Sequence, residues 1–127
     1  MIAVDTSSLI AFLAGLPGRD VELVDLALQD KQVIFPPVVL TEALSDPKLP
    51  KSVSKLLKAV PVLEVSEGYW QRSGALRAKV ITKGLRARLA DALIAQSCLD
   101  HDIGLITRDG DFRHFARYGG LKLFPAG

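Results

Sequence analysis

The feature that most constrains this chain is the apolar run Ile2–Val4, which ends directly on the carboxylate of Asp5. Similar short apolar runs recur along the sequence, and the segments between them carry apolar residues at helical spacing. Strands that alternate with helices require crossover connections, which give a mainly parallel sheet covered by helices. Folds of this class bind ligands beyond the carboxyl ends of their strands. Residues that directly follow a strand are therefore the first candidates for a functional site.

The pattern predicts one domain over residues 1–127, because the chain is long enough to bury a core and no linker or repeat divides it. Pro37 suits the first turn of a helix, where a missing N–H is harmless, and Gly84 suits a position just after a helix end. The expected strands are Ile2–Val4, Gln32–Phe35, Val62–Val65, Gly104–Thr107 and Lys122–Phe124. The expected helices are Ser7–Ala14, Asp20–Gln29, Pro37–Ser45, Lys51–Ala59, Glu67–Thr82, Ala90–His101 and Phe112–Arg117.

The composition indicates a folded protein of a reducing compartment. A hydrophobic fraction of 49% is typical of globular domains. The longest apolar run, Val33–Leu40, is too short to cross a bilayer, so we expect no membrane association. The start of the chain lacks the basic region and apolar stretch of a secretory signal, and the single Cys98 excludes an internal disulfide. We therefore expect a cytoplasmic protein.

The net charge of +2 does not by itself indicate a nucleic-acid partner. Its distribution is more informative, because residues 71–90 carry several basic side chains and no acidic one. Such a stretch is either a solvated helix face or a surface for a polyanionic substrate. The basic residues in it are Arg72, Arg77, Lys79, Lys83, Arg86 and Arg88.

Three acidic residues stand where a solvated surface role explains them only in part. Asp5 follows the first strand, and it could equally cap the next helix. Glu42 shares a helix face with Val38 and Val39, so its ionised form needs either water or a positive partner there. Asp91 is a first-turn acid favoured by the helix dipole. The dipole does not explain why Asp91 lies on the same face as apolar residues three, four and seven positions later.

A further pair of acids, Asp109 and Asp111, follows the expected strand Gly104–Thr107 in the stretch TRDGDF. Either is an ordinary turn former and either could cap the next helix. Carboxylates that converge at one edge of a sheet raise each other's pKa unless a cation neutralises them. Oxygen ligands without a cluster of His or Cys indicate Mg²⁺, or Mn²⁺ as the alternative, rather than zinc. The sequence therefore favours a hard-cation site at this edge.

Four short motifs together resemble those of PIN-domain ribonucleases, specifically the VapC-type toxins of type II toxin–antitoxin systems. They are VDTS around Asp5, TEAL around Glu42, DALIAQ around Asp91 and TRDGDF near the C-terminus, and they span most of the chain. None is specific alone, whereas all four in this order are. The resemblance implies an α/β fold, namely a PIN-like three-layer α/β/α sandwich with a mainly parallel central sheet of four to five strands.

Carried over residue by residue, the resemblance implies catalytic roles for Asp5, Glu42, Asp91 and Asp109. It implies metal ligation by Asp5, Asp91, Asp109 and Asp111, with Asp109 ahead of Asp111 as the fourth acid. The proline that the family often has before the third acid is absent, since Leu89-Ala90 stands there. The supporting hydroxyl groups are those of Thr6 and Thr107. The candidates for holding RNA phosphates are Arg86, Arg88, Arg108 and Arg113.

The activity that the resemblance implies is endoribonucleolytic cleavage, in which a metal-activated water attacks the phosphorus of an RNA phosphodiester. It also implies a homodimer and a VapB-like antitoxin that inserts a segment near the active site. Residues of two predicted helices could line a groove for that segment, or they could simply pack in the core. They are Leu9, Phe12, Leu13, Val53, Leu56 and Leu57.

Other readings of the acids remain open. A non-catalytic PIN-like module that binds RNA or protein would keep the fold and lack the cleavage. A phosphoacceptor receiver domain would need paired acids after the first strand and a lysine after the last strand, whereas Lys122 lies inside an expected strand. A phosphatase of the haloacid dehalogenase type would need an aspartate where Ser7 stands.

Overall fold

The structure is a computed structural model and describes residues 1–126. Its centre is a sheet of four short strands, all parallel, in the order β2-β1-β3-β4. In this arrangement β1 lies between β2 and β3, so the carboxyl ends of β1 and β3 are neighbours. The strands are β1 (Ile2–Val4), β2 (Val33–Ile34), β3 (Leu105–Ile106) and β4 (Leu123–Phe124).

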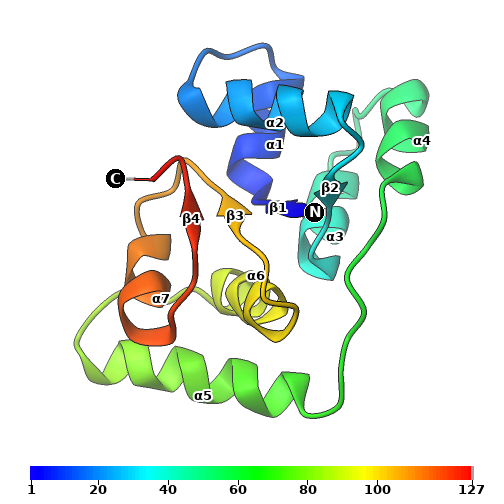
Figure 1. Ribbon diagram of the computed structural model, residues 1–127. Coiled ribbons are helices and arrows are strands. Elements are labelled where there is room, and N and C mark those ends of the chain that lie inside the picture. Colours follow the sequence, from blue (N-terminus) through cyan, green and yellow to red (C-terminus); the bar gives the residue numbers. More distant parts are fainter. Residues whose placement is uncertain (127) are drawn as a thin grey trace.

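Helices pack on both faces of the sheet, as Figure 1 shows: α1 and α2 lie on one side, and α5, α6 and α7 on the other. The three-layer α/β/α sandwich with a parallel sheet, predicted from the sequence, is therefore confirmed. The helices are α1 (Thr6–Leu13), α2 (Arg19–Gln29), α3 (Pro37–Leu44), α4 (Lys51–Ala59), α5 (Tyr69–Thr82), α6 (Leu89–Asp100) and α7 (Phe112–Gly119).

The helix ends follow from the local sequence. Pro37 occupies the first turn of α3, where its ring fixes a helical φ and no N–H is missed. Gly84 follows Lys83, the C-cap of α5, and has φ +73°, the left-handed conformation that glycine adopts without a Cβ penalty. Both predictions made for these residues are confirmed. The helix with the missing proline, α6, begins at Leu89, so Asp91 lies in its first turn.

The prediction of a strand at Val62–Val65 is wrong. Residues 62–65 contribute a single parallel bridge, between Val62 and Phe35, and no strand in the described part of the chain. The backbone of Phe35 exchanges hydrogen bonds with Pro61 and Leu63, at 2.8 and 2.9 Å. Val62 and Val65 are exposed, and of these four residues Leu63 alone is buried, so too little apolar surface packs here to extend the bridge into a strand. The apolar run was therefore not a sufficient signal for a strand.

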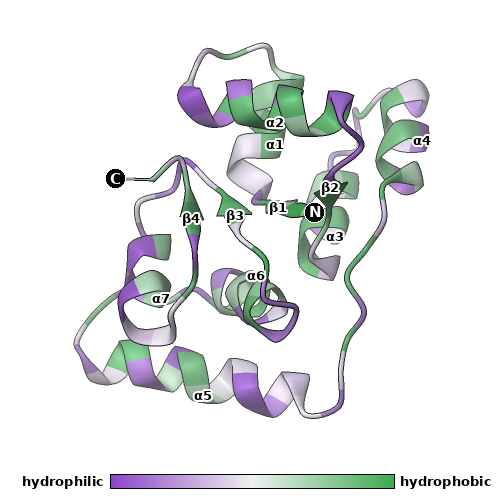
Figure 2. Ribbon diagram, in the orientation of Figure 1, coloured by the Kyte–Doolittle hydropathy of each residue, from purple (hydrophilic) through white to green (hydrophobic). Residues whose placement is uncertain are grey.

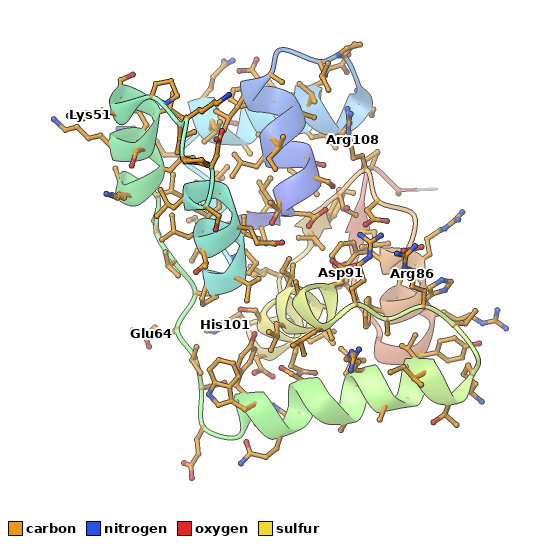
Figure 3. The ribbon with its side chains drawn as sticks, turned by 180° about the vertical axis from the view of Figure 1, so that it is seen from behind. Lys51, Glu64, Arg86, Asp91, His101 and Arg108 are labelled. Atoms are coloured by element: carbon orange, nitrogen blue, oxygen red, sulfur yellow. The ribbon has the colours of Figure 1, made fainter. Side chains whose placement is uncertain are left out.

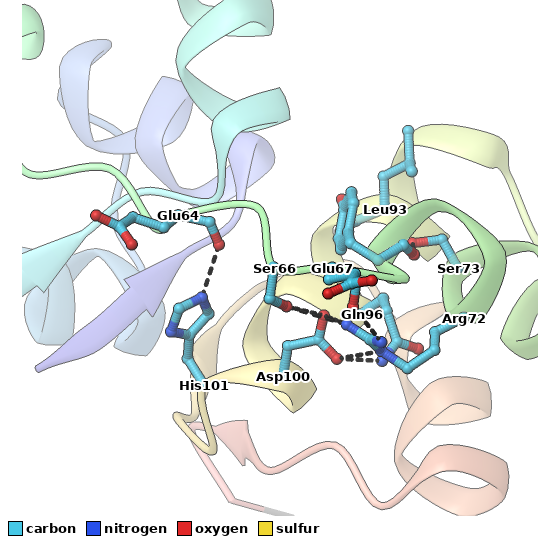
Figure 4. Close-up of polar contacts among 10 residues, drawn as sticks. Glu64, Ser66, Glu67, Arg72, Ser73, Leu93, Gln96, Asp100 and His101 are labelled. Carbon is cyan, nitrogen blue, oxygen red and sulfur yellow. Dashed lines mark hydrogen bonds and ion pairs between the residues drawn. The ribbon is translucent and has the colours of Figure 1, made fainter.

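The same connection is held to α6 by polar contacts instead (Figure 4). Arg72 donates hydrogen bonds from Nε and Nη2 to both carboxylate oxygens of Asp100, at 2.9 and 2.7 Å. Ser66 and Gln96 donate to the same carboxylate. His101, which is exposed, contacts the carbonyl of Glu64 through Nε2 at 2.8 Å. These contacts fix the end of α6 against the start of α5, and α6 carries Asp91.

The core includes the strands and buried residues of the helices on both faces of the sheet, and the strands are the most continuously hydrophobic elements (Figure 2). Ala3 and Val4 of β1 and Leu105 and Ile106 of β3 are 0–1% exposed. Burial on both faces explains why these strands are apolar throughout rather than alternating. Along the described chain, residues 1–126, no helix combines the length and the apolar character that crossing a membrane requires.

Candidate active site

The register of the sheet brings Asp5 next to Thr107. Val4 pairs with Ile106, so the residues that follow these two strands lie side by side. Thr107 Oγ1 donates a hydrogen bond of 2.9 Å to Asp5 Oδ2, and Ser7 Oγ donates to the same oxygen at 2.5 Å. Burial raises the pKa of Asp5, while these two hydroxyl groups oppose the rise by stabilising the carboxylate. The Asp5 side chain is therefore held by two residues on different elements.

Of these carboxylates, Asp91 has the surroundings that least favour its ionised form. Its Oδ2 is buried and has no hydrogen-bond partner among residues 1–126. Burial, which is the largest cause, and the negative charges of Asp5 and Asp109 together raise the pKa of Asp91 to about 6, against the opposing charge of Arg88. The apolar face predicted for α6 is confirmed, because Ile94, Ala95 and Cys98 are each no more than 1% exposed. Among the described residues, an ionised Asp91 is therefore compensated only in part, by the charge of Arg88, and its Oδ2 has no hydrogen-bond donor.

Asp109 and Asp111 lie in the turn between β3 and α7 but face different partners. The Asp109 amide donates to Thr107 Oγ1 at 3.0 Å, and Asp109 Oδ1 accepts from the Asp111 amide at 2.9 Å. The charge of Asp109 raises the pKa of both Asp5 and Asp91, which places it with those two acids. Asp111 forms a 4.0 Å ion pair with Arg86. The turn therefore directs Asp109 toward Asp5 and Asp91, and it directs Asp111 toward the guanidinium of Arg86.

Glu42 reaches the site from α3. Thr6 Oγ1 donates a 2.6 Å hydrogen bond to Glu42 Oε1, across 36 residues of chain. The Glu42 charge is a further, smaller cause of the raised pKa of Asp91. Glu42 is exposed, in contrast to Asp5 and Asp91, so water stabilises its ionised form. The fold thus brings Asp5, Asp91 and Asp109 into electrostatic contact, with Glu42 at the margin.

Three of the four arginines named from the sequence surround this group at the surface. Arg86 and Arg88 precede α6, Arg113 lies in α7, and all three are exposed. Arg113 Nε donates to the carbonyl of Gly110 at 3.1 Å. In Figure 3, Arg86 and Arg108 lie on the same side of the molecule as Asp91 and far from Lys51.

Arg108 differs from these three, because its guanidinium is bound within the protein. Its Nε and Nη2 donate to the two carboxylate oxygens of Asp20, at 2.9 and 3.2 Å. Sequence reasoning did not single out Asp20, Ser8, which contacts it, or Ser7. Asp20 reads as an ordinary first-turn acid of a helix, and only the tertiary contact with Arg108 distinguishes it. The position of Ser7, two residues after Asp5, was a usable signal, because short hydroxyl side chains bond nearby carboxylates and backbone groups.

The chemistry of the donor set fits a hard divalent cation. All the donors are carboxylate or hydroxyl oxygens, and the buried oxygen of Asp91 needs a positive partner. Within residues 1–126, however, no three His, Cys, Asp or Glu side chains are arranged as a complete metal-binding group. The carboxylates therefore lie close enough to raise the pKa of Asp91 but do not converge on a single point.

A separate apolar groove lies between α1, α2 and α4, with a volume of about 700 Å³. Its exposed wall includes Leu13 and Leu56, which are 40% and 69% exposed. All six residues named from the sequence as groove candidates line it. Among these six, Leu9 and Leu57 also belong to the buried core, as the packing alternative predicted for them. The lining residues include Leu9, Phe12, Leu13, Val53, Leu56 and Leu57.

Several solved structures share the fold across nearly the whole chain. VapBC2 from Rickettsia felis, bound to a DNA fragment from its promoter, is 21% identical, with a TM-score of 0.73 and 97% of each chain covered. FitAB bound to an IR36 DNA fragment is 20% identical, with a TM-score of 0.75, 98% of this chain covered and 94% of that one. VapBC-5 from Mycobacterium tuberculosis is 19% identical, with a TM-score of 0.64 and 98% of each chain covered.

No curated protein matches the sequence. The family model described as the PIN domain matches residues 2–118, which include every acid of the candidate site. This match covers most of the 127 residues. The chain therefore belongs to the PIN domain family.

Proposed function

We propose that this chain is a VapC-type toxin, a single PIN domain that acts in the cytoplasm as a metal-dependent endoribonuclease. The observation that carries the proposal is the buried Oδ2 of Asp91, which lacks a partner among residues 1–126 and faces the charges of Asp5 and Asp109. A purely structural aspartate in a core would be paired or neutralised. Perturbed acids clustered beyond the strands of an α/β sheet are typical of a functional site.

In this proposal Asp5, Asp91 and Asp109 hold Mg²⁺ or Mn²⁺, with Asp111 nearby. The cation, when bound, neutralises these carboxylates and lowers the pKa of a water that attacks the phosphodiester. Thr107 and Ser7 orient the Asp5 carboxylate through their hydroxyl groups. Thr6 orients Glu42, whose exposed carboxylate accepts a proton or bonds the attacking water.

RNA is the substrate that best fits the surroundings of the acids. Arg86, Arg88 and Arg113 are exposed around the site and can contact phosphates of a bound strand. Arg88 also opposes the raised pKa of Asp91, so it favours the ionised form that binds a cation.

For the partner, we propose an antitoxin segment of VapB type in the apolar groove between α1, α2 and α4. The groove is open to solvent through Leu13 and Leu56, and Lys31 at its rim can pair with an acidic residue of the segment. The fold neighbours named above are toxin–antitoxin complexes, which supports a partner of this kind. We also propose that the toxin is a homodimer.

Membership of the PIN family removes the receiver-domain and phosphatase alternatives. A non-catalytic PIN module is the remaining one, and the test is cleavage. We expect the purified chain to cleave a structured RNA with Mg²⁺ or Mn²⁺ and to lose this activity in EDTA. Asp91→Asn should reduce cleavage at least 100-fold, since charge-stabilising residues of active sites contribute on that order. Equal cleavage by the Asp5→Asn, Asp91→Asn double variant would contradict the proposal.

A further inference from the structure

An ion pair joins the buried Asp20 to Arg108, which directly precedes Asp109 in the chain. Arg108 donates from Nε and Nη2 to the two carboxylate oxygens of Asp20, and Ser8 Oγ donates to Asp20 Oδ2 at 2.8 Å. The Asp20 side chain is 7% exposed and the Arg108 side chain 33%. A carboxylate this buried, with donors on two other elements, is held in one orientation.

The loop between α1 and α2 packs against this ion pair. Arg108 Nη2 also donates to the carbonyl of Pro17 at 3.0 Å. Gly18 follows with φ +153°, and a Cβ at this position would lie 2.5 Å from Asp20 Oδ1 and 2.7 Å from Arg108 Nη2. Only a residue without a side chain allows the backbone to approach the pair so closely. The glycine at position 18 therefore leaves the space that the ion pair occupies.

The pair joins the two segments that orient Asp5. Ser8 directly follows Ser7, which donates to Asp5 from the first turn of α1. Arg108 lies between Thr107, which donates to the same oxygen of Asp5, and Asp109. A displacement of the first turn of α1 would therefore move the hydroxyl donor Ser7 away from Asp5. A displacement of the turn after β3 would move the hydroxyl donor Thr107, and with it Asp109.

We propose that Asp20 and Arg108 are positioning residues, which fix the first turn of α1 against the turn after β3 and so set the cation affinity of the acid group. Arg108 is then held by protein contacts rather than by RNA phosphates, because its Nε and Nη2 atoms donate to Asp20 and Pro17. This inference rests on the proposed function. Partners that orient metal ligands typically change metal affinity 10–100-fold when they are removed.

The experiment measures Mn²⁺ affinity of the full chain by calorimetric or electron-spin-resonance titration. We expect Asp20→Asn and Arg108→Gln each to weaken Mn²⁺ binding about 10-fold or more. The matched controls are Glu22→Gln and Arg19→Gln, which break an exposed ion pair on the same helix, with side chains 67% and 70% exposed. We expect the controls to stay within twofold of the wild type, because exposed pairs contribute little.

A second measurement separates positioning from phosphate contact. RNA binding is titrated in EDTA at several salt concentrations, where each lost phosphate contact lowers the slope of log K against log salt by about one. We expect Arg108→Gln to leave this slope unchanged and Arg113→Gln to lower it. A lowered slope for Arg108→Gln together with unchanged Mn²⁺ affinity would overturn the inference.

Folding of each variant is checked by thermal unfolding. If Asp20→Asn or Arg108→Gln unfolds, Arg108→Lys is compared instead, since it keeps the charge and loses the paired geometry. We expect Arg108→Lys to weaken Mn²⁺ binding relative to the wild type, and unchanged affinity in Arg108→Lys would count against the inference. A wild-type chain that binds Mn²⁺ and cleaves no RNA refutes the proposed function alone, whereas one that binds no Mn²⁺ refutes the inference as well.

Discussion

Thr107 Oγ1 lies 2.9 Å from Asp5 Oδ2, although 102 residues separate the two along the chain. The same oxygen atom of Thr107 accepts a hydrogen bond from the Asp109 amide. One hydroxyl group therefore connects the acid after β1 to the acid after β3, and the parallel pairing of these strands creates the contact.

Replacing this hydroxyl should weaken the site and the fold together. Thr107→Val keeps the shape of the side chain but leaves the buried Asp5 carboxylate with one donor fewer. We expect the free energy of unfolding to fall by about 1–2 kcal/mol, as for other lost buried hydrogen bonds, and Mn²⁺ affinity to fall about 10-fold. Chemical denaturation and metal titration measure the two effects.

The matched control is Thr82→Val. The Thr82 hydroxyl bonds only the Ala78 carbonyl one turn earlier on an exposed face of α5. We expect its effect on unfolding to stay within about 0.5 kcal/mol. Equal effects of the two substitutions would mean that the Thr107 hydroxyl has no special part in holding Asp5.

The raised pKa of Asp91 predicts a stability that depends on pH. The pKa is about 6 in the folded protein against an ordinary value of 3.8, so between these values the folded state binds more protons than the unfolded state. Without metal, the wild type should therefore lose stability as pH rises from about 4 to above 6. Asp91→Asn does not titrate and should be more stable than the wild type at pH 7.5, by on the order of 1–3 kcal/mol.

This difference is measured by denaturant unfolding in EDTA at pH 4.5, 6 and 7.5. We expect the two proteins to approach each other at the acid end, because Asp91 is then protonated in the folded wild type. A wild type that gains stability relative to Asp91→Asn as pH rises would show that the Asp91 carboxylate is compensated after all.

Divalent cations should stabilise the folded chain. A ligand present at 100 times its Kd adds about 2.7 kcal/mol to the free energy of unfolding, so millimolar Mn²⁺ should raise Tm by several degrees. The increase should disappear in the Asp5→Asn, Asp91→Asn double variant, because two of the three proposed ligands are then neutral. Differential scanning calorimetry with and without EDTA makes the measurement, and an equal increase in both proteins would place the cation elsewhere.

The apolar groove predicts a variant that loses its protein partner and keeps its fold. Leu56 is 69% exposed at the groove, so Leu56→Asp should unfold at nearly the wild-type temperature. We expect it to bind a VapB-type antitoxin at least 10-fold more weakly, because a buried unpaired charge opposes docking. Leu26→Asp is the control, since Leu26 is 57% exposed on α2 and does not line the groove. Equal loss in both variants would exclude the groove as the docking surface.

The contact between Arg72 and Asp100 should matter more for stability than an exposed pair. The Asp100 side chain is 9% exposed, and Arg72 holds its pKa below the ordinary value through two hydrogen bonds. Arg72→Ala should lower the free energy of unfolding by about 2 kcal/mol, because Asp100 loses its main partner. Arg19→Ala, which breaks the exposed pair with Glu22, should cost less than about 0.5 kcal/mol. Urea unfolding of both variants compares them directly.

Much of the fold and of the candidate site was predictable from local sequence. The apolar runs around Ala3 and Leu105 are buried on both faces, and this burial requires continuous hydrophobicity. The start of α3 and the end of α5 were also readable, because Pro37 and Gly84 restrict or free the backbone independently of the rest of the protein. The apolar run at residues 62–65 led to a wrong strand prediction, because pairing with a sheet depends on a neighbouring strand and not on the run itself.

The sequence by itself determined which acids stand at the ends of elements, because strand and helix boundaries are local properties. Only the tertiary structure decided what those acids contact. It separated Asp109 from Asp111 by the direction of one turn, and it paired Arg108 with Asp20. Hydrogen bonds and ion pairs act over a few ångströms in space, and the residues that they join here are up to 102 positions apart. Chain folding therefore had to select the partners that no local pattern specifies.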